Sequence, residues 1–268
     1  MRALLRGTGI ALLTLLAGCA WINSLRGGGA GDDPLRVGTT GTYPPFSFDR
    51  GGTLEGIEID FARALGAELG RGVEIFRVPL PDLIGELNAD RIDVVMTGMS
   101  VTASRAALVD FAEPYLELGQ MALVRAQDGD RFVGRDWVKI DGLRVGFERS
   151  TTGAKFVRNE LPQMTPVEFS NKSDAIAALK EGKIDVLVHD APFVWLISGS
   201  PQAPNEELLG RYNLLTNEKL AWAVRKDDDD LQVRLNGIVA RWKASGKIDE
   251  ILDRWIRVRK IARPIPPH

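Results

Sequence analysis

The sequence has very little of several residue types that define common functional classes. Its 268 residues include one cysteine, Cys19, and two histidines, His189 and His268. A single cysteine excludes a disulfide within the chain, and the histidines have no Cys/His spacing of the kind that holds zinc or iron. Charge of one sign is also scarce, because 34 Lys and Arg stand against 36 Asp and Glu. The chain therefore has no global positive field with which to gather nucleic acid.

Catalytic and cofactor motifs are missing as well. No Gly-x-Ser-x-Gly elbow occurs, since residues 98–102 fail at the last position, and no Walker loop is present. The glycine-rich residues 27–31 follow no strand and precede no helix, unlike a dinucleotide-binding turn. We read the acidic run 227–230 as the first turn of a helix and the basic C-terminal end as a solvated face. No cofactor and no metal are expected.

The composition suits an ordinary globular body behind a targeting segment. Hydrophobic residues make up 44% of the chain, enough for one large or two medium domains. At the N-terminus, Arg2 and Arg6 precede an apolar run over residues 10–17, followed by Gly18 and Cys19. This order is typical of a secretory signal, and the run is too short to span a bilayer.

The only cysteine lies in a specific context. Leu16-Ala17-Gly18-Cys19 resembles the bacterial lipoprotein box, in which the cysteine becomes the lipidated first residue of the mature chain. We therefore predict a signal peptide over residues 1–18 and lipidated Cys19 with a flexible tether over residues 19–33. Several acyl chains would hold the protein at a membrane, since one chain binds only marginally. The alternative is a plain secretory signal with a chance cysteine.

Two short motifs occur in the same order in both halves of the chain. Leu35-Arg36-Val37-Gly38 recurs as Leu143-Arg144-Val145-Gly146, and Ile92-Asp93-Val94 recurs as Ile184-Asp185-Val186. Each first copy reads as a short apolar strand, and each second copy follows a helical pattern. Strands alternating with helices at this spacing indicate parallel α/β sheets, one in each half.

The C-terminal part departs from a simple tandem. An apolar strand is predicted over residues 219–224, and helical periodicity follows over residues 231–245 and 248–256. If this part returns to the first half, two connections cross between the halves. A pair of crossings makes a hinge.

One longer motif identifies a family. Gly56-Ile57-Glu58-Ile59-Asp60-Phe61, followed by Leu65 and Gly66, resembles the signature of the bacterial extracellular solute-binding proteins of family 3, which deliver polar amino acids to ABC importers. The resemblance extends from Leu35 to about Ile256. It implies an α/β fold of the two-lobed periplasmic-binding-protein class, type II. Lobe 1 would comprise residues 34–116 and 219–262, lobe 2 residues 117–218, with hinge crossings near 116–120 and 215–220.

An amino acid ligand brings a carboxylate and an ammonium group into a water-poor cleft, so the site needs opposite charges. For the carboxylate, the best partners are an arginine and the N–H groups at a helix N-terminus. After a strand ending at Thr97, Gly98 allows a turn, and Thr102 can cap a helix that carries Arg105. The resemblance implies that Arg105 grips the carboxylate and that Gly98 and Ser100 offer polar groups. The alternative is a solvated arginine beside a helix cap.

The second half offers a complementary pair of segments. Residues 149–153 lie between a predicted strand over 143–147 and a helix beginning near Ala154, where they could complete the carboxylate site or only cap the helix. By resemblance, Thr152 is the best match to the family's carboxylate loop. Asp190 follows a strand over residues 184–188 and matches the aspartate that binds the ligand amino group.

His189 precedes Asp190, as in glutamine-type binders. The alternatives are that Asp190 only caps the helix opened by Pro192 and that His189 is structural.

Ligand selectivity is predicted from three positions. The resemblance places Tyr43 against the ligand side chain, but Leu80 occupies the second aromatic place of the family, so stacking on two faces is incomplete. Thr40 stands where binders of basic or amide side chains have aspartate. By the same resemblance, Arg149 stands where glutamine-type binders carry a lysine, and its positive charge further disfavours a cationic ligand side chain. We expect a neutral polar or acidic amino acid.

One branch of this fold, the cyclohexadienyl dehydratases, is catalytic. Thr39-Thr40-Gly41 and Pro45-Phe46-Ser47 resemble it. However, Phe193 replaces the glutamate that would act as general acid, Thr42 replaces a turn aspartate, and Arg149 replaces an asparagine.

We therefore predict a binding protein without enzymatic activity: a monomeric, extracytoplasmic, lipid-anchored receptor. It would close on a small amino acid and dock on the membrane subunits of an ABC importer. A separate sensor partner remains an alternative to the importer.

Overall fold

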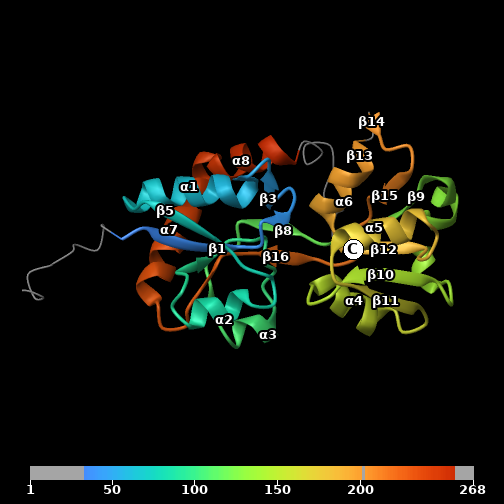
Figure 1. The fold of residues 1–268 in the computed structure, drawn as a ribbon, viewed down its shortest axis with the longest axis horizontal. Helices are drawn as coiled ribbons and strands as arrows, with labels where there is room; N and C mark the ends of the chain where they lie inside the picture. The colour runs from blue at the N-terminus through green and yellow to red at the C-terminus, as the bar shows by residue number, and fades with distance from the viewer. Residues whose placement is uncertain (1–32, 201–202, 257–268) are drawn as a thin grey trace, which may run out of the picture.

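The computed structural model describes residues 33–200 and 203–256, which form two α/β lobes side by side (Figure 1). The predicted signal peptide and Cys19 lie outside the described residues. Lobe 1 contains a five-stranded sheet. Its strands, in sheet order, are β5 (Val73–Arg77), β1 (Leu35–Thr39), β6 (Val94–Val95), β17 (Ala223–Val224) and β7 (Asp110–Phe111).

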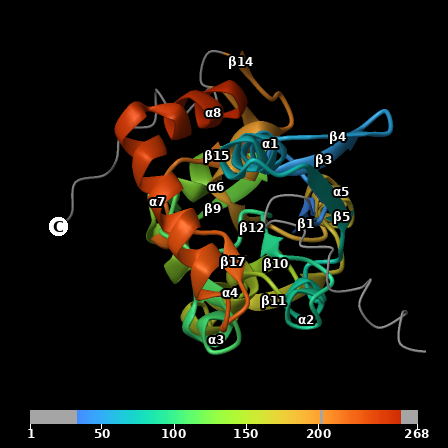
Figure 2. The same ribbon diagram turned by 90° about the vertical axis from the view of Figure 1, so that its left-hand side faces the viewer.

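The remaining elements of lobe 1 come from both ends of the chain, and Figure 2 shows the C-terminal helices beside the first helix of the chain. Its helices are α1 (Ile57–Leu69), α2 (Leu83–Asn88), α3 (Ala103–Ala106), α7 (Asp229–Ser245) and α8 (Lys247–Trp255). A small antiparallel sheet consists of β2 (Thr42–Tyr43), β3 (Ser47–Arg50) and β4 (Thr53–Glu55). Among the described helices, none combines the length and the apolar character needed to cross a bilayer.

Lobe 2 is built around a second five-stranded sheet. Its strands, in sheet order, are β11 (Thr165–Phe169), β10 (Arg144–Glu148), β12 (Val186–Asp190), β9 (Gln120–Arg125) and β15 (Leu208–Arg211). Its helices are α4 (Thr152–Glu160), α5 (Lys172–Lys180) and α6 (Ala191–Ser198), with 3-10 turns η1 (Ala126–Phe132) and η2 (Asp136–Lys139). A short ribbon pairs β13 (Gly199–Ser200) with β14 (Ala203–Pro204).

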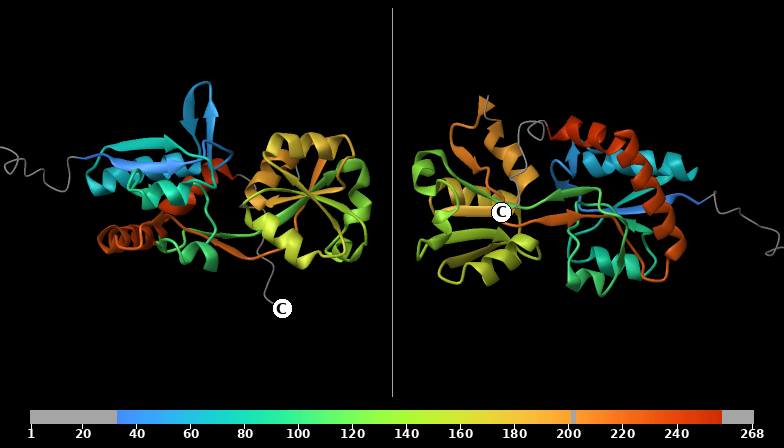
Figure 3. Two further views of the ribbon diagram at one scale, coloured as in Figure 1. Left: turned by 60° about the horizontal axis from the view of Figure 1, so that its bottom comes forward. Right: turned by 180° about the vertical axis from the view of Figure 1, so that it is seen from behind.

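Two strands cross between the lobes. β8 (Leu116–Leu118) and β16 (Glu218–Leu220) pair antiparallel in the connection, as the rear view in Figure 3 shows. The single strand predicted over residues 219–224 is therefore wrong. Because β16 pairs with β8 whereas β17 belongs to the sheet of lobe 1, the chain must change partners at Ala221 and Trp222.

The repeated motifs occupy equivalent places in the two sheets. The strand order β5-β1-β6 in lobe 1 matches β11-β10-β12 in lobe 2. In lobe 1 the backbone N–H of Arg36 donates to Asp93 at 2.9 Å, and its guanidinium donates to the same carboxylate at 2.6 Å. Arg144 bonds to Asp185 in the same way, at 3.0 and 2.8 Å. The repeated residues therefore join neighbouring strands at corresponding positions in the two sheets.

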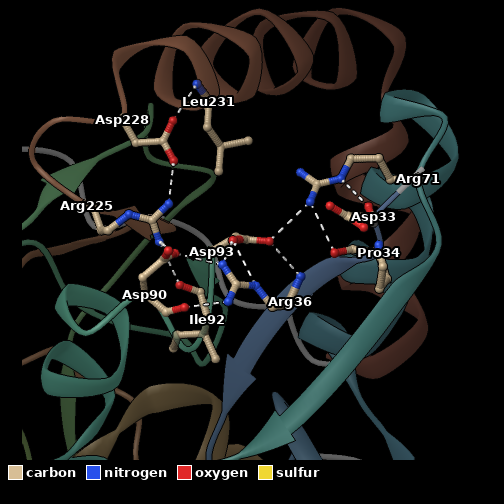
Figure 4. Close-up of polar contacts among 10 residues, drawn as sticks. All are labelled: Asp33, Pro34, Arg36, Arg71, Asp90, Ile92, Asp93, Arg225, Asp228 and Leu231. Atoms are coloured by element: carbon tan, nitrogen blue, oxygen red, sulfur yellow. Dashed lines mark hydrogen bonds and ion pairs between the residues drawn. The ribbon is translucent and has the colours of Figure 1, made fainter. Parts of the chain in front are cut away.

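In lobe 1 this pair belongs to a larger network (Figure 4). Arg71 also reaches Asp93, at 3.2 Å, while Arg225 joins Asp90 and Asp228 at 3.0 and 3.1 Å. Asp228 accepts the N–H of Leu231 and so caps α7, whose first turn contains Asp229 and Asp230 of the predicted acidic run. Burial alone would raise the pKa of Asp93, but the hydrogen bonds and charges of the two arginines hold it below its ordinary value.

Replacing Asp93 by asparagine should destabilise lobe 1. The side chain of Asp93 is 9% exposed, and its loss as an anion leaves two arginines without their shared buried partner. We expect the free energy of unfolding to fall by about 3 kcal/mol near neutral pH, measured by urea denaturation. Because the folded pKa is depressed, the difference should shrink as pH falls through the carboxyl range. Asp90→Asn is the matched control: that side chain is 69% exposed, and we expect a loss below about 1 kcal/mol.

Candidate functional site

A cavity of about 880 Å³ lies between the two lobes, at the carboxyl ends of the parallel strands of both sheets. Its size suits a small molecule. The structure brings all the candidate ligand-binding residues from the sequence into its lining: Thr40, Tyr43, Gly98, Ser100, Arg105, Arg149, Thr152, His189 and Asp190.

Arg105 is held in position by its own loop. Thr102 caps the short helix α3 by accepting the N–H of Arg105 at 3.2 Å, as predicted. The guanidinium donates to the carbonyl of Ser100 at 2.9 Å and, across the cleft, to the carbonyl of Ser150 at 3.5 Å. Desolvation lowers the pKa of Arg105, opposed by the charges of Asp190 and Glu218. An arginine remains a cation in such a site, and unused N–H donors remain for an anion.

Asp190 lies on the opposite side of the cleft, at the last position of β12. It is the N-cap residue of α6 but makes no side-chain capping bond, which argues against the purely structural alternative. Its carboxylate instead accepts the hydroxyl of Tyr43 from lobe 1 and the side-chain amide of Gln120. A carboxylate has about four acceptor positions, so two of these bonds leave room for a cationic donor.

The N-terminus of α4 faces the same cavity. The helix begins at Thr152, two residues earlier than expected, because Thr151 is the cap and accepts the N–H of Ala154 at 3.1 Å. The N–H groups of the first helical turn have no partner within the helix, and the helix dipole favours an anion there. Thr152 also accepts a bond from Gln120 at 3.1 Å.

A buried carboxylate holds the loop that carries Gly98 and Ser100. It belongs to Glu58 of the family motif, to which no role was assigned from the sequence. Glu58, 1% exposed at the start of α1, accepts the N–H of Gly98 at 2.6 Å. Tyr115 and Trp222 donate to the same carboxylate at 2.6 and 3.0 Å. The N–H of Gly98 is therefore committed to Glu58, and the polar group that Gly98 can still offer to a ligand is its carbonyl oxygen.

The two glycines of this arrangement have conformations that exclude other residues. Gly98 has a φ of 69°, and a side chain there would lie 2.9 Å from the ring of Phe46. Gly56, the first residue of the family signature, has a φ of 127° and lies against the backbone carbonyl of Phe46. Both positions need glycine because α1 and the ligand loop approach Phe46 closely.

Glu58 should make stability depend on pH. Burial raises its pKa to about 7, against hydrogen bonds that favour the anion. Because the folded pKa exceeds the unfolded value of 4.5, protonated Glu58 contributes to the free energy of unfolding. This contribution is complete below pH 4.5 and is lost as pH rises through 7. We expect roughly 3 kcal/mol of loss between about pH 5 and pH 8, at about 1.36 kcal/mol per pKa unit. Denaturant titrations of the parent and Glu58→Gln measure it; parallel pH profiles for the two proteins would contradict the assignment.

A chain of polar side chains connects the two hinge crossings behind the cleft. Ser100 of lobe 1 donates its hydroxyl to Glu218 at 2.6 Å. Glu218 also accepts bonds from Thr216 at 2.8 Å and from Gln120 at 3.0 Å. The amide nitrogen of Gln120 thus has two hydrogens for three acceptors, namely Glu218, Thr152 and Asp190. This places Glu218 and Gln120, neither of which sequence reasoning identified, between the ligand-facing groups of the two lobes.

His189 and Tyr43 are committed to bonds of their own. The ring Nδ1 of His189 accepts the N–H of Asp190 at 2.8 Å, and Nε2 lies 3.3 Å from Glu148. Burial and the charge of Asp190 hold the pKa of Tyr43 well above its ordinary value, so it stays a hydroxyl donor. His189 therefore has a structural role as well as a place in the cavity wall.

Further charged residues line the cavity, among them Arg149, Glu148 and Lys172. Arg149 is exposed, and its side chain makes no hydrogen bond or ion pair with any described residue. Solvent therefore screens its charge. The preceding residue, Glu148, and Lys172 of α5 instead line the cavity as an ion pair at 2.8 Å. Thr40 bonds to Thr97 at 3.3 Å, and Leu80 lines the cavity in place of a second aromatic.

Comparison with known proteins agrees with this architecture. The sequence model of the bacterial extracellular solute-binding proteins, family 3, matches residues 35–258. ABC transporter arginine-binding protein 1 of Escherichia coli K12 is 29% identical over 241 residues, which is 88% of this chain and 96% of the relative.

Solved structures match over most of their length. A binding component of an ABC transporter from Wolinella succinogenes, complexed with lysine, has a TM-score of 0.78 at 27% identity and covers 86% of this chain and 98% of its own. An ancestral amino acid-binding protein, described as a precursor of cyclohexadienyl dehydratase, has a TM-score of 0.74 at 30% identity and covers 84% and 95%.

Proposed function

Because the chain belongs to the bacterial extracellular solute-binding proteins of family 3, we propose that it captures one small amino acid outside the cytoplasm for an ABC importer. The observation that carries the proposal is the placement of opposite charges across one cavity, Arg105 on lobe 1 and Asp190 on lobe 2. A carboxylate and an ammonium group on the same small molecule can bridge them.

The ligand would hold the two lobes together. Its carboxylate would lie between Arg105 and the N-terminus of α4, and its ammonium group would bond to Asp190. A ligand favours the closed form only through contacts that the open form lacks, and bridging contacts between lobes meet this condition. The closed form would then dock on the importer's membrane subunits, with lipidated Cys19 keeping the protein at the membrane.

The ligand class is proposed to be a neutral polar or acidic amino acid. Neutral Thr40 bonds to Thr97 within the cavity wall and adds no negative charge. The carboxylate of Glu148 is already paired with Lys172. The Escherichia coli relative is named for arginine, and the Wolinella structure contains lysine. The charges of the cavity lining therefore decide whether this chain also binds a cationic amino acid.

A dehydratase on the same fold is the second candidate, since one structural neighbour is described as a precursor of such an enzyme. Position 193, where the resemblance would require an acid, holds a phenylalanine that is 2% exposed and packs 4.3 Å from the ring of His189. An apolar side chain at this position cannot donate a proton to a leaving hydroxyl.

A thermal-shift screen of the mature protein tests the proposal. The ligands are the twenty amino acids and a set of dicarboxylates, with prephenate in a separate turnover assay. We expect a raised melting temperature with one amino acid or a few related ones, and no phenylpyruvate absorbance from prephenate. No shift with any amino acid would overturn the proposal, and turnover of prephenate would favour the enzyme.

A further inference from the structure

Lys172 lies in an unusual place for a lysine. It is the first residue of α5, where the helix dipole disfavours a cation, and its side chain is only 15% exposed. Asn171 already caps the helix by accepting the N–H of Asp174 at 3.0 Å, so the helix does not need Lys172. The side chain lines the same cavity as Arg105 and Asp190. Its position therefore requires an explanation from its partners in the cavity.

Those partners form a site for a cation. The ammonium group of Lys172 donates to both oxygens of Glu148, at 3.1 and 2.8 Å. It also lies 5.0 Å from the ring centroid of Tyr43, within the range of a cation–π contact. Glu148 is 18% exposed. Although burial alone would raise its pKa, His189 and Lys172 hold it below the ordinary value, so it is an anion.

A half-buried carboxylate beside an aromatic face is the chemistry that binds a guanidinium or an ammonium group of a ligand side chain. In this chain the cation is supplied by the protein itself. A cationic ligand would have to displace Lys172 from Glu148 and Tyr43 or lie beside a like charge in a poorly hydrated cavity. A neutral polar side chain meets neither obstacle.

We propose that Lys172 is a specificity-determining residue: a tethered cation that lies beside Glu148 and Tyr43 in the ligand cavity and excludes cationic amino acids. The proposal rests on the proposed amino acid site, because it assigns the other end of the same ligand. It predicts that removing Lys172 converts the cavity to one that accepts arginine and lysine.

Calorimetric titration of L-arginine, L-lysine, L-glutamine and L-glutamate tests the assignment. In Lys172→Met, we expect affinity for arginine and lysine to rise at least about tenfold relative to glutamine, because Glu148 and Tyr43 become free. The double variant Lys172→Met/Glu148→Gln should lose that gain, since the freed carboxylate is gone. Lys180→Met is the matched control, since Lys180 lies on the same helix, pairs with Glu207 and is outside the cavity.

The opposite substitution provides an independent arm that does not depend on the folding of Lys172→Met. In Glu148→Gln, Lys172 keeps its charge without its partner, and we expect affinity for glutamate to rise at least about tenfold relative to glutamine. If amino acids bind the parent but neither variant changes its preference in these directions, Lys172 is not the specificity residue, and the proposed function stands. If no amino acid binds any of these proteins, the proposed function fails together with this inference.

Discussion

Replacing Arg105 by alanine should abolish amino acid binding while leaving the protein folded. The guanidinium is the only cation in the described structure that reaches from the ligand loop of lobe 1 toward the N-terminus of α4, through its bonds to Ser100 and Ser150. Without it, the ligand carboxylate would keep only the N–H groups of α4, because Lys172 is paired with Glu148 and Arg149 is exposed to solvent. Leaving a buried charge uncompensated costs about 3–5 kcal/mol, so the affinity should fall at least about a hundredfold.

Calorimetry with the best ligand from the screen measures the effect, and thermal unfolding without ligand reports on folding. Arg105→Lys should recover part of the affinity, because it restores the charge but not the two-pronged geometry. Arg63→Ala serves as control, since this arginine lies on α1 with a side chain 59% exposed. If Arg105→Ala bound within a few-fold of the parent, the carboxylate would have to be placed elsewhere in the cavity.

The second large effect is expected from Asp190→Asn. The amide keeps the size of the side chain and can still bond to Tyr43 and Gln120, so the lobe contact survives. The charge that would meet the ligand ammonium group is lost, and we expect affinity to fall at least about a hundredfold. Asp136→Asn in lobe 2, 88% exposed and outside the cavity, is the control. Retained affinity in Asp190→Asn would show that another group binds the ammonium.

Much of the site could be predicted because its signals are local in sequence. A glycine turn and a capping threonine place Arg105 within eight residues of Gly98, as expected, although the preceding strand β6 ends at Val95 rather than at Thr97. The repeated motifs likewise predicted the parallel strands β5-β1-β6 and β11-β10-β12. The expectation of fully parallel sheets is wrong, because the other two strands of each sheet join through antiparallel pairs. Local rules for turns and caps hold whatever the rest of the chain does.

The groups that were missed depend on segments far apart in the chain. Glu58 holds Trp222 across 164 residues, and Ser100 meets Glu218 across 118 residues. Nothing in the sequence pairs a lysine at a helix start with the last residue of a neighbouring strand, so Lys172 and Glu148 were not identified. The sequence instead directed attention to Arg149, the exposed neighbour of Glu148.

The most direct test of a ligand bridging the two lobes is a calorimetric comparison of three molecules: the amino acid that gives the largest thermal shift, its analogue without the α-amino group, and its analogue without the α-carboxylate. Arg105 and Asp190 require both charges on one molecule, so we predict that only the intact amino acid binds and that each analogue is at least about a hundredfold weaker. Binding of either analogue within about tenfold of the intact amino acid would contradict the account.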